Sequence, residues 1–112
     1  MKKHIDLTEL NKVAEGDQEF VRETITILVE EIPVNIESIN EFARTEDIDS
    51  LKKIIHKMKS SFMLIGMIEL WPIVETIEKS DSKEVILPQI PAYIQICTEA
   101  VQELLNIQNS GN

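Results

Sequence analysis

Apolar residues recur every three or four positions along most of the chain, which is the spacing of amphipathic helices. The longest such run covers residues 17–44, with Val21, Ile25, Leu28, Ile32, Ile36, Ile39 and Phe42 in register. The register continues through Pro33, and a proline removes one helical hydrogen bond without moving the apolar face. We therefore expect one long helix, kinked at Pro33, with Asp17 as its N-cap.

The same spacing predicts a short helix before this one and a longer helix after it. The short helix follows Asp6, its expected N-cap, and ends at Gly16, with Leu7, Leu10 and Val13 on one face. A turn at Thr45–Asp47 supplies capping acids for the next helix, which ends at Gly66. Its apolar face consists of Ile48, Leu51, Ile55, Met58, Phe62 and Ile65.

Two further helices complete the predicted architecture. One begins near Ile68, has Pro72 in its first turn or just after it, and stops in the polar stretch Ser80–Lys83. The last begins within Pro88–Pro91, and residues 108–112 form a frayed tail after it. Four amphipathic helices with short connections favour an all-α fold, an antiparallel up-down four-helix bundle with a short additional N-terminal helix.

The composition agrees with this reading and narrows the function. With 112 residues, 43% of them hydrophobic, the chain is one domain that can bury a core, and its lone Cys97 has no disulfide partner. The net charge of −9 argues against nucleic acid and membrane surfaces as partners. No apolar run reaches membrane-spanning length, and Asp6 interrupts any signal sequence, so we expect a cytoplasmic protein.

Most catalytic and metal-binding motifs are absent from the sequence. It has no Walker loop, dinucleotide-binding glycine motif, zinc-protease motif or paired Cys-x-x-Cys, and Ser80–Lys83 matches Ser-x-x-Lys without its companion motifs. His4 is expected in a disordered N-terminus, and the acidic clusters at 30–31 and 46–49 are expected to be solvated helix ends. We therefore predict no intrinsic metal and no intrinsic cofactor.

His56 lies off the apolar face of its helix. Counting about 100° per residue from Leu51, the buried positions fall within roughly 40° of zero and His56 falls near 140°. Residues 50–68 contain Lys52, Lys53, Lys57 and Lys59 and no acid, whereas the rest of the chain carries a net −13. A surface histidine among lysines is common, but an exposed imidazole beside cations also suits a nucleophile for a phosphoryl group.

The segment His56–Gly66 resembles the active-site helix of histidine-containing phosphotransfer (HPt) domains of phosphorelays, whose pattern is roughly H-x-L-K-G-S-[SA]-x-x-x-G. The likeness extends to residues 16–23, to Glu30–Pro33, and to the apolar positions before Glu78. It covers about residues 5–107, and family members fold as four-helix bundles with an exposed histidine midway along one helix.

The resemblance implies a mechanism and partners. His56 would accept a phosphoryl group from a receiver-domain phospho-aspartate through Nε2 and pass it to another receiver aspartate. Lys59 would stabilise the phosphate, and Lys57 would assist Lys59 or contact the receiver. Glu78 would accept a hydrogen bond from Nδ1–H of His56 and so fix the tautomer of the ring. The partners would be response-regulator receivers and a hybrid sensor histidine kinase. The carrier would be a monomer without kinase activity, and the Mg²⁺ would belong to the receiver.

Three features leave alternatives open. Ser60 stands where the family usually has glycine, and its hydroxymethyl group either crowds the receiver or hydrogen-bonds the imidazole or phosphoryl oxygens. Met63 and Leu64 are either partly buried or, with Lys52 on the rim, part of a docking surface. The alternative function is a helical adaptor or degenerate module that binds receivers or kinases without transfer. Met1 shortly before the first helix favours a free-standing protein.

Overall fold

Helices form where the sequence supplies both a capping residue and an apolar face. In a computed structural model, which describes residues 3–110, Asp17 accepts a hydrogen bond from the backbone N–H of Phe20 and begins α2 (Gln18–Arg44). Asp47 accepts one from the N–H of Ser50 and begins α3 (Ile48–Leu64). These acids satisfy N–H groups that a helix start leaves without partners, so both predicted caps are confirmed.

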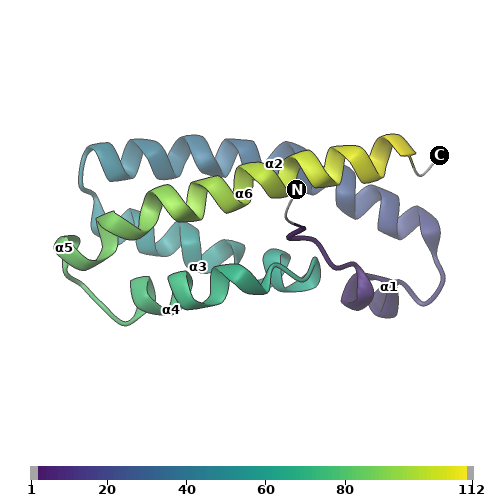
Figure 1. The fold of residues 1–112 in the computed structure, drawn as a ribbon, viewed down its shortest axis with the longest axis horizontal. Helices are drawn as coiled ribbons and strands as arrows, with labels where there is room; N and C mark the ends of the chain where they lie inside the picture. Colours follow the sequence, from purple (N-terminus) through teal and green to yellow (C-terminus); the bar gives the residue numbers. More distant parts are fainter. Residues whose placement is uncertain (1–2, 111–112) are drawn as a thin grey trace.

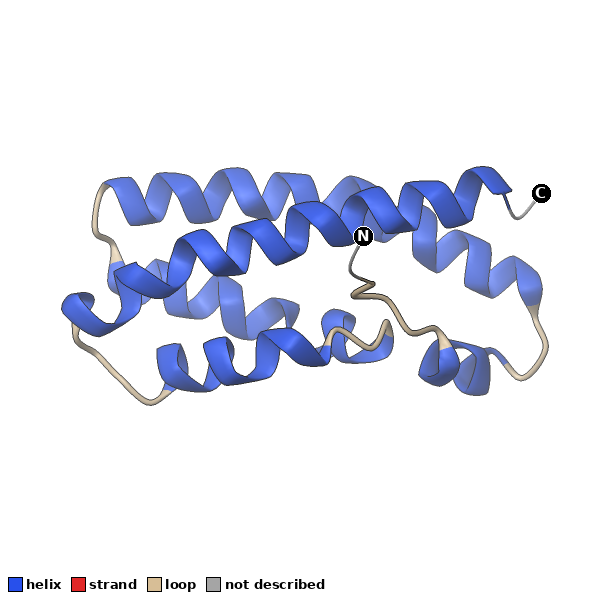
Figure 2. Ribbon diagram, viewed as in Figure 1, coloured by secondary structure: helices blue, strands red, loops and turns tan. Residues whose placement is uncertain are grey.

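The described residues contain helices, turns and loops but no strand, which confirms the predicted all-helical class (Figure 2). Besides α2 and α3, they form α1, the 3-10 turn η1, α4, the short α5, the 3-10 turn η2 and α6. Their bounds are Thr8–Ala14, Ile68–Leu70, Trp71–Glu78, Lys83–Ile86, Leu87–Gln89 and Ile90–Ser110 respectively. None of the helices within residues 3–110 is long and apolar enough to cross a membrane.

Four helices share the long axis of the molecule. Figure 1 shows α2 and α6 lying side by side, with α3 and α4 beneath them and the chain reversing direction from each of these helices to the next. The α2 helix is continuous through Pro33, as the apolar register predicted. The buried core runs between the helices and includes Ile32, Ile55, Ile77, Tyr93 and Leu104, each at most 1% exposed.

Some predicted boundaries are wrong. The first helix begins at Thr8, Asp6 lies before its cap residue, and Val13, expected on the buried face, is 55% exposed. The short α5 and η2 precede the last helix and were not predicted. The tail expected over 108–112 is helical as far as Ser110, and residues 111–112 lie outside the described part of the chain. One-turn elements and fraying ends carry too little apolar periodicity to be located from sequence.

The N-terminal segment, expected to be disordered around His4, is instead anchored. The His4 side chain is 2% exposed, with Nδ1 2.5 Å from Glu69 Oε1 and Nε2 2.7 Å from Glu99 Oε1. The backbone N–H of His4 donates to Glu103 at 2.7 Å, and that of Asp6 donates to the carbonyl of Ile65 at 2.9 Å. The prediction failed because the carboxylates that bind His4 are more than sixty residues away in the chain.

The close approach of this segment explains Gly66. Its φ is +73°, and a Cβ there would lie 2.6 Å from the backbone oxygen of Asp6. Only glycine combines that backbone angle with that clearance. The glycine that ends α3 therefore also lets the N-terminal segment, residues 3–7, pack against the end of the helix that carries His56.

Candidate functional site

The α3 helix presents His56 to solvent because its neighbours face the core. Leu51, Ile55, Met58 and Phe62 are at most 2% exposed, which fixes the rotation of the helix. His56 follows Ile55 by one residue and therefore points out of the core, and its side chain is 72% exposed. The predicted position of His56 on the solvent side of the helix is confirmed by this exposure.

Glu78, the last residue of α4, lies against the His56 ring. Its Oε2 is 2.8 Å from His56 Nδ1. An ionised carboxylate only accepts hydrogen bonds, so Nδ1 carries the proton that it donates to Glu78. In a neutral imidazole the lone pair then resides on Nε2. Within residues 3–110 no hydrogen bond occupies Nε2, so the ring nitrogen that carries the lone pair is the accessible one.

Lys59 binds the second oxygen of the same carboxylate. Its Nζ donates to Glu78 Oε1 at 2.9 Å, and its side chain is 34% exposed. The hydrogen bonds from His56 and then Lys59 hold the pKa of Glu78 below its usual range. Glu78 is thus an ionised acceptor at neutral pH. It links the histidine to a cation one turn further along α3.

A hollow of about 320 Å³ lies between α3 and α4 beside this site. Lys59 and Glu78 line it together with Met63, Trp71, Val74 and Glu75. Met63, predicted as either packing or docking surface, is 58% exposed there. Trp71 was missed, although Trp71, Glu75 and Glu78 share one face of a helix by their i, i+4 and i+7 spacing.

The structure separates the remaining predicted residues. Lys52 binds the loop after α4, because its Nζ donates to the Ser80 carbonyl at 2.7 Å and to Asp81 Oδ1 at 2.8 Å. Lys57 is exposed on the side of α3 that borders α2, away from Glu78. Ser60 is exposed one turn after His56, and Leu64 is half-buried against the core. Lys59 and Glu78 are therefore the charged groups that meet at the histidine.

The charged side chains around His56 contact one another through hydrogen bonds. In the part of the chain that the structure describes, no group of three or more His, Cys, Asp or Glu side chains is arranged to hold a metal ion. In the cluster around His4, each ring nitrogen contacts a different carboxylate, Nδ1 that of Glu69 and Nε2 that of Glu99. A metal ligand needs one ring nitrogen free for the ion.

Comparison with known proteins places the chain in a family. No curated protein and no solved structure matches it. The Hpt domain family model matches residues 23–106, which is most of the 112-residue chain and includes α3, α4 and the His56–Glu78 pair. Members of this family are histidine phosphocarriers of phosphorelays. The exposed histidine, its carboxylate partner and this match together show that the chain belongs to the Hpt domain family.

Proposed function

We propose that this protein is a phosphocarrier in which His56 takes a phosphoryl group from the phospho-aspartate of one receiver domain and gives it to the aspartate of another. The observation that carries the proposal is the hydrogen bond of 2.8 Å between Nδ1 of an exposed His56 and Glu78, which leaves Nε2 as the nucleophile. The all-helical fold supports this role, because α3 and α4 bring His56 and Glu78 together at the surface.

In the proposed step the Nε2 lone pair forms a bond to phosphorus, and the bond between phosphorus and the aspartate oxygen breaks. The aspartate leaves as a carboxylate, so no proton has to be supplied to the leaving group. The imidazole ring, which keeps its Nδ1 proton, becomes cationic, and Glu78 offsets that charge. Transfer to the second receiver is the same step in reverse.

Lys59 is proposed to stabilise the transferred group. A phosphoryl group brings about −1.5 to −2 charges to the surface. Lys59 lies one turn from His56 and now pairs with Glu78, so its ammonium can contact a phosphoryl oxygen while it stays near the carboxylate. Lys57, Ser60, Met63 and Leu64 are proposed to contact the receiver. Lys52 has its charge paired with Asp81 and contributes to the rim.

We propose that the receivers supply the Mg²⁺ and most of the stabilisation of the transition state, and that the protein acts as a cytoplasmic monomer without kinase activity of its own. A hybrid sensor histidine kinase is the proposed upstream partner.

We propose that a receiver docks on the hollow that Met63, Trp71 and Val74 form beside Lys59. Transient interfaces combine a small apolar centre with a charged rim, and this hollow has both.

The test is direct labelling. The protein is incubated with a panel of receiver domains from the source organism, each phosphorylated beforehand and purified from the phosphodonor. We expect acid-labile, alkali-stable phosphate on the protein, absent from His56→Gln and present in His4→Gln. If wild-type protein acquires no phosphate from any receiver but still binds one, the adaptor alternative replaces this proposal. Phosphate that persists in His56→Gln would assign the wrong nucleophile.

A further inference from the structure

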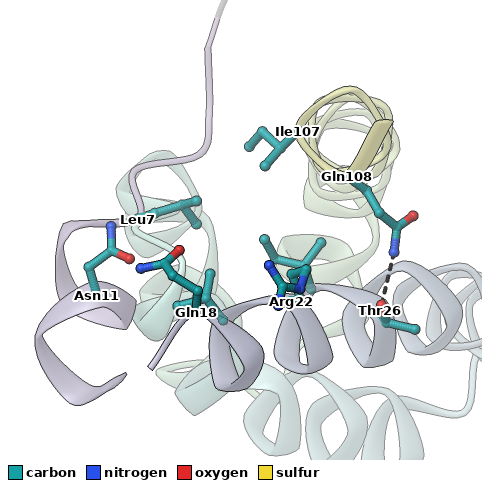
Figure 3. Close-up of a pocket in the computed structure, with 9 residues that line it drawn as sticks. Leu7, Asn11, Gln18, Arg22, Thr26, Ile107 and Gln108 are labelled. Atoms are coloured by element: carbon teal, nitrogen blue, oxygen red, sulfur yellow. Dashed lines mark hydrogen bonds between the residues drawn. The ribbon is translucent and has the colours of Figure 1, made fainter. Parts of the chain in front are cut away.

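A cavity of about 280 Å³ opens where α1, the first turns of α2 and the last turns of α6 meet (Figure 3). Its apolar surface comes from Leu7, Val21, Ile25 and Ile107. Val21 and Ile25 are 7% and 3% exposed and belong to the core, so the floor of the cavity is fixed. Figure 3 shows Leu7 and Ile107 on opposite sides of the cavity.

The polar part of the lining is cationic and amide-rich. Of the described residues that line the cavity, Arg22 alone is charged, and none is acidic. Asn11, Gln18 and Gln108 add carboxamide groups, and Gln108 Nε2 donates to Thr26 Oγ1 at 2.9 Å. In a protein with twenty acidic residues and a net charge of −9, a cavity lined by one cation and no acid is suited to an anionic group.

Arg22 retains donors for such a group. Its Nη2 donates to Glu19 Oε1 at 3.0 Å, and Glu19 does not line the cavity. A guanidinium has five N–H donors, so one bond to Glu19 leaves the planar fork able to bind a second carboxylate. Glu19 would nevertheless compete with a bound anion for the charge of Arg22.

From this arrangement we propose that the cavity binds a small organic carboxylate, with an aliphatic chain on Val21 and Ile25 and its carboxylate on Arg22. The cavity volume lies just below the usual range of ligand pockets, about 300–1,000 Å³, which limits the ligand to a short chain. None of the lining residues lies on α3 or α4, the helices of His56 and Glu78. The proposal therefore does not depend on the phosphocarrier function.

The experiment titrates the full-length protein with octanoate and follows methyl and amide NMR resonances. We expect saturable shifts centred on the four apolar lining residues. Arg22→Gln should weaken octanoate binding about fivefold, the effect of losing one exposed ion pair. Glu19→Gln should tighten it, because the competing carboxylate is gone. Arg44→Gln is the matched control, since Arg44 also pairs with an acid three residues earlier, Glu41, but lies at the other end of α2.

Matched ligands separate the roles of chain and charge. Octanol, octylammonium and acetate should all bind more weakly than octanoate. Octanol has no charge, octylammonium has a positive charge, and acetate lacks the aliphatic chain. Octanol that binds as tightly as octanoate, or Arg22→Gln with unchanged affinity, would overturn the assignment of an anion site. The absence of saturable shifts at the cavity with octanoate would overturn the proposal altogether.

Discussion

The two histidines of this protein have opposite surroundings. His4 is 2% exposed and has a carboxylate on each ring nitrogen, whereas His56 is 72% exposed and has a carboxylate on Nδ1 alone. With both nitrogens facing acceptors, the His4 ring must donate from both, so it is held as a cation without a lone pair to share. His56 keeps Nε2 open, which is the requirement for a nucleophile.

The number and placement of carboxylates determine what each histidine can do. Burial of the His4 ring opposes its charge, but the hydrogen bonds to Glu99 and Glu69 and the charges of Glu69 and Glu103 together outweigh that effect and raise the pKa of His4. The same kind of contact, made once and at the surface, orients His56 without blocking it. The first histidine therefore fastens the chain end, and the second is available for chemistry.

The largest expected effect of breaking this contrast is on the rate of phosphoryl transfer in Glu78→Gln. The amide keeps the shape but loses the charge that fixes the tautomer, offsets the cationic ring and positions Lys59. We expect the rate to fall roughly tenfold, the factor given by about 1.4 kcal/mol in the barrier. Rapid-quench measurement of the approach to phosphorylated protein checks this.

Glu75→Gln is the matched control. Glu75 lies on the same helix and lines the same hollow, but it pairs with Lys79 and not with His56 or Lys59. We expect its transfer rate to stay within about twofold of wild type, since exposed pairs of this kind contribute little. Equal losses in the two variants would mean that the hollow only docks the receiver and that Glu78 has no special role.

The next largest effect is on stability, at the other histidine. His4→Gln removes two charge-assisted hydrogen bonds from a buried position, so the free energy of unfolding should fall by about 2 kcal/mol. His56→Gln should change it by less than about 0.5 kcal/mol, because the side chain is exposed. Urea denaturation of both variants measures the contrast, and equal losses would contradict it.

The stability that His4 contributes should depend on pH. Its pKa is raised on folding, so the contribution is complete below the unfolded value of ~6.5 and is lost as the pH rises through the folded value. The hydrogen bond to His4 is the main cause that lowers the pKa of Glu99. The stability that Glu99 contributes is therefore lost as the pH falls toward acid denaturation. Glu69 and Glu103 also face the ring and its backbone.

We therefore expect the difference in unfolding free energy between wild type and His4→Gln to be largest near pH 6 and to shrink at alkaline pH. Urea titrations at a series of pH values give this difference directly. A difference that grows as the pH rises would show that His4 is bound as a neutral ring, contrary to the two-carboxylate geometry.

The smallest expected effect is that of Ser60→Gly. The side chain is exposed and, within residues 3–110, makes no hydrogen bond to His56. If Ser60 merely crowds the receiver, the glycine variant transfers phosphate a few times faster. An unchanged rate would show that Ser60 has no role in phosphoryl transfer. Helix stability must be measured in parallel, because glycine in a helix costs about 0.5–1 kcal/mol.

Local patterns were enough to predict the major helices and one side of the site. The register of Val21, Ile25 and Leu28 predicted α2, and the rotation set by Leu51 and Ile55 placed His56 on the solvent side. These inferences need only the helical period and residues on one element. The position of Glu78 beside His56 came from the family resemblance, since no local rule brings together residues on two different helices.

The anchoring of the N-terminus was not predictable in that way. His4 has no apolar periodicity around it, and its carboxylate partners stand at 69, 99 and 103. Trp71 was overlooked because its importance lies in the hollow that it forms with α3, not in its own helix. Contacts between distant segments are set by tertiary packing, which sequence patterns alone do not specify.

Phosphorylation of His56 on Nε2 can be tested by identifying the phosphorylated atom itself. Protein labelled with ¹⁵N in its histidine rings is phosphorylated by a receiver domain, and the coupling between phosphorus and ring nitrogen is measured by NMR. The hydrogen bond from Nδ1 to Glu78 predicts one phosphohistidine, with phosphorus on Nε2 of His56 and the His4 resonances unchanged. Phosphorus on Nδ1 of His56, or on His4, would contradict this account.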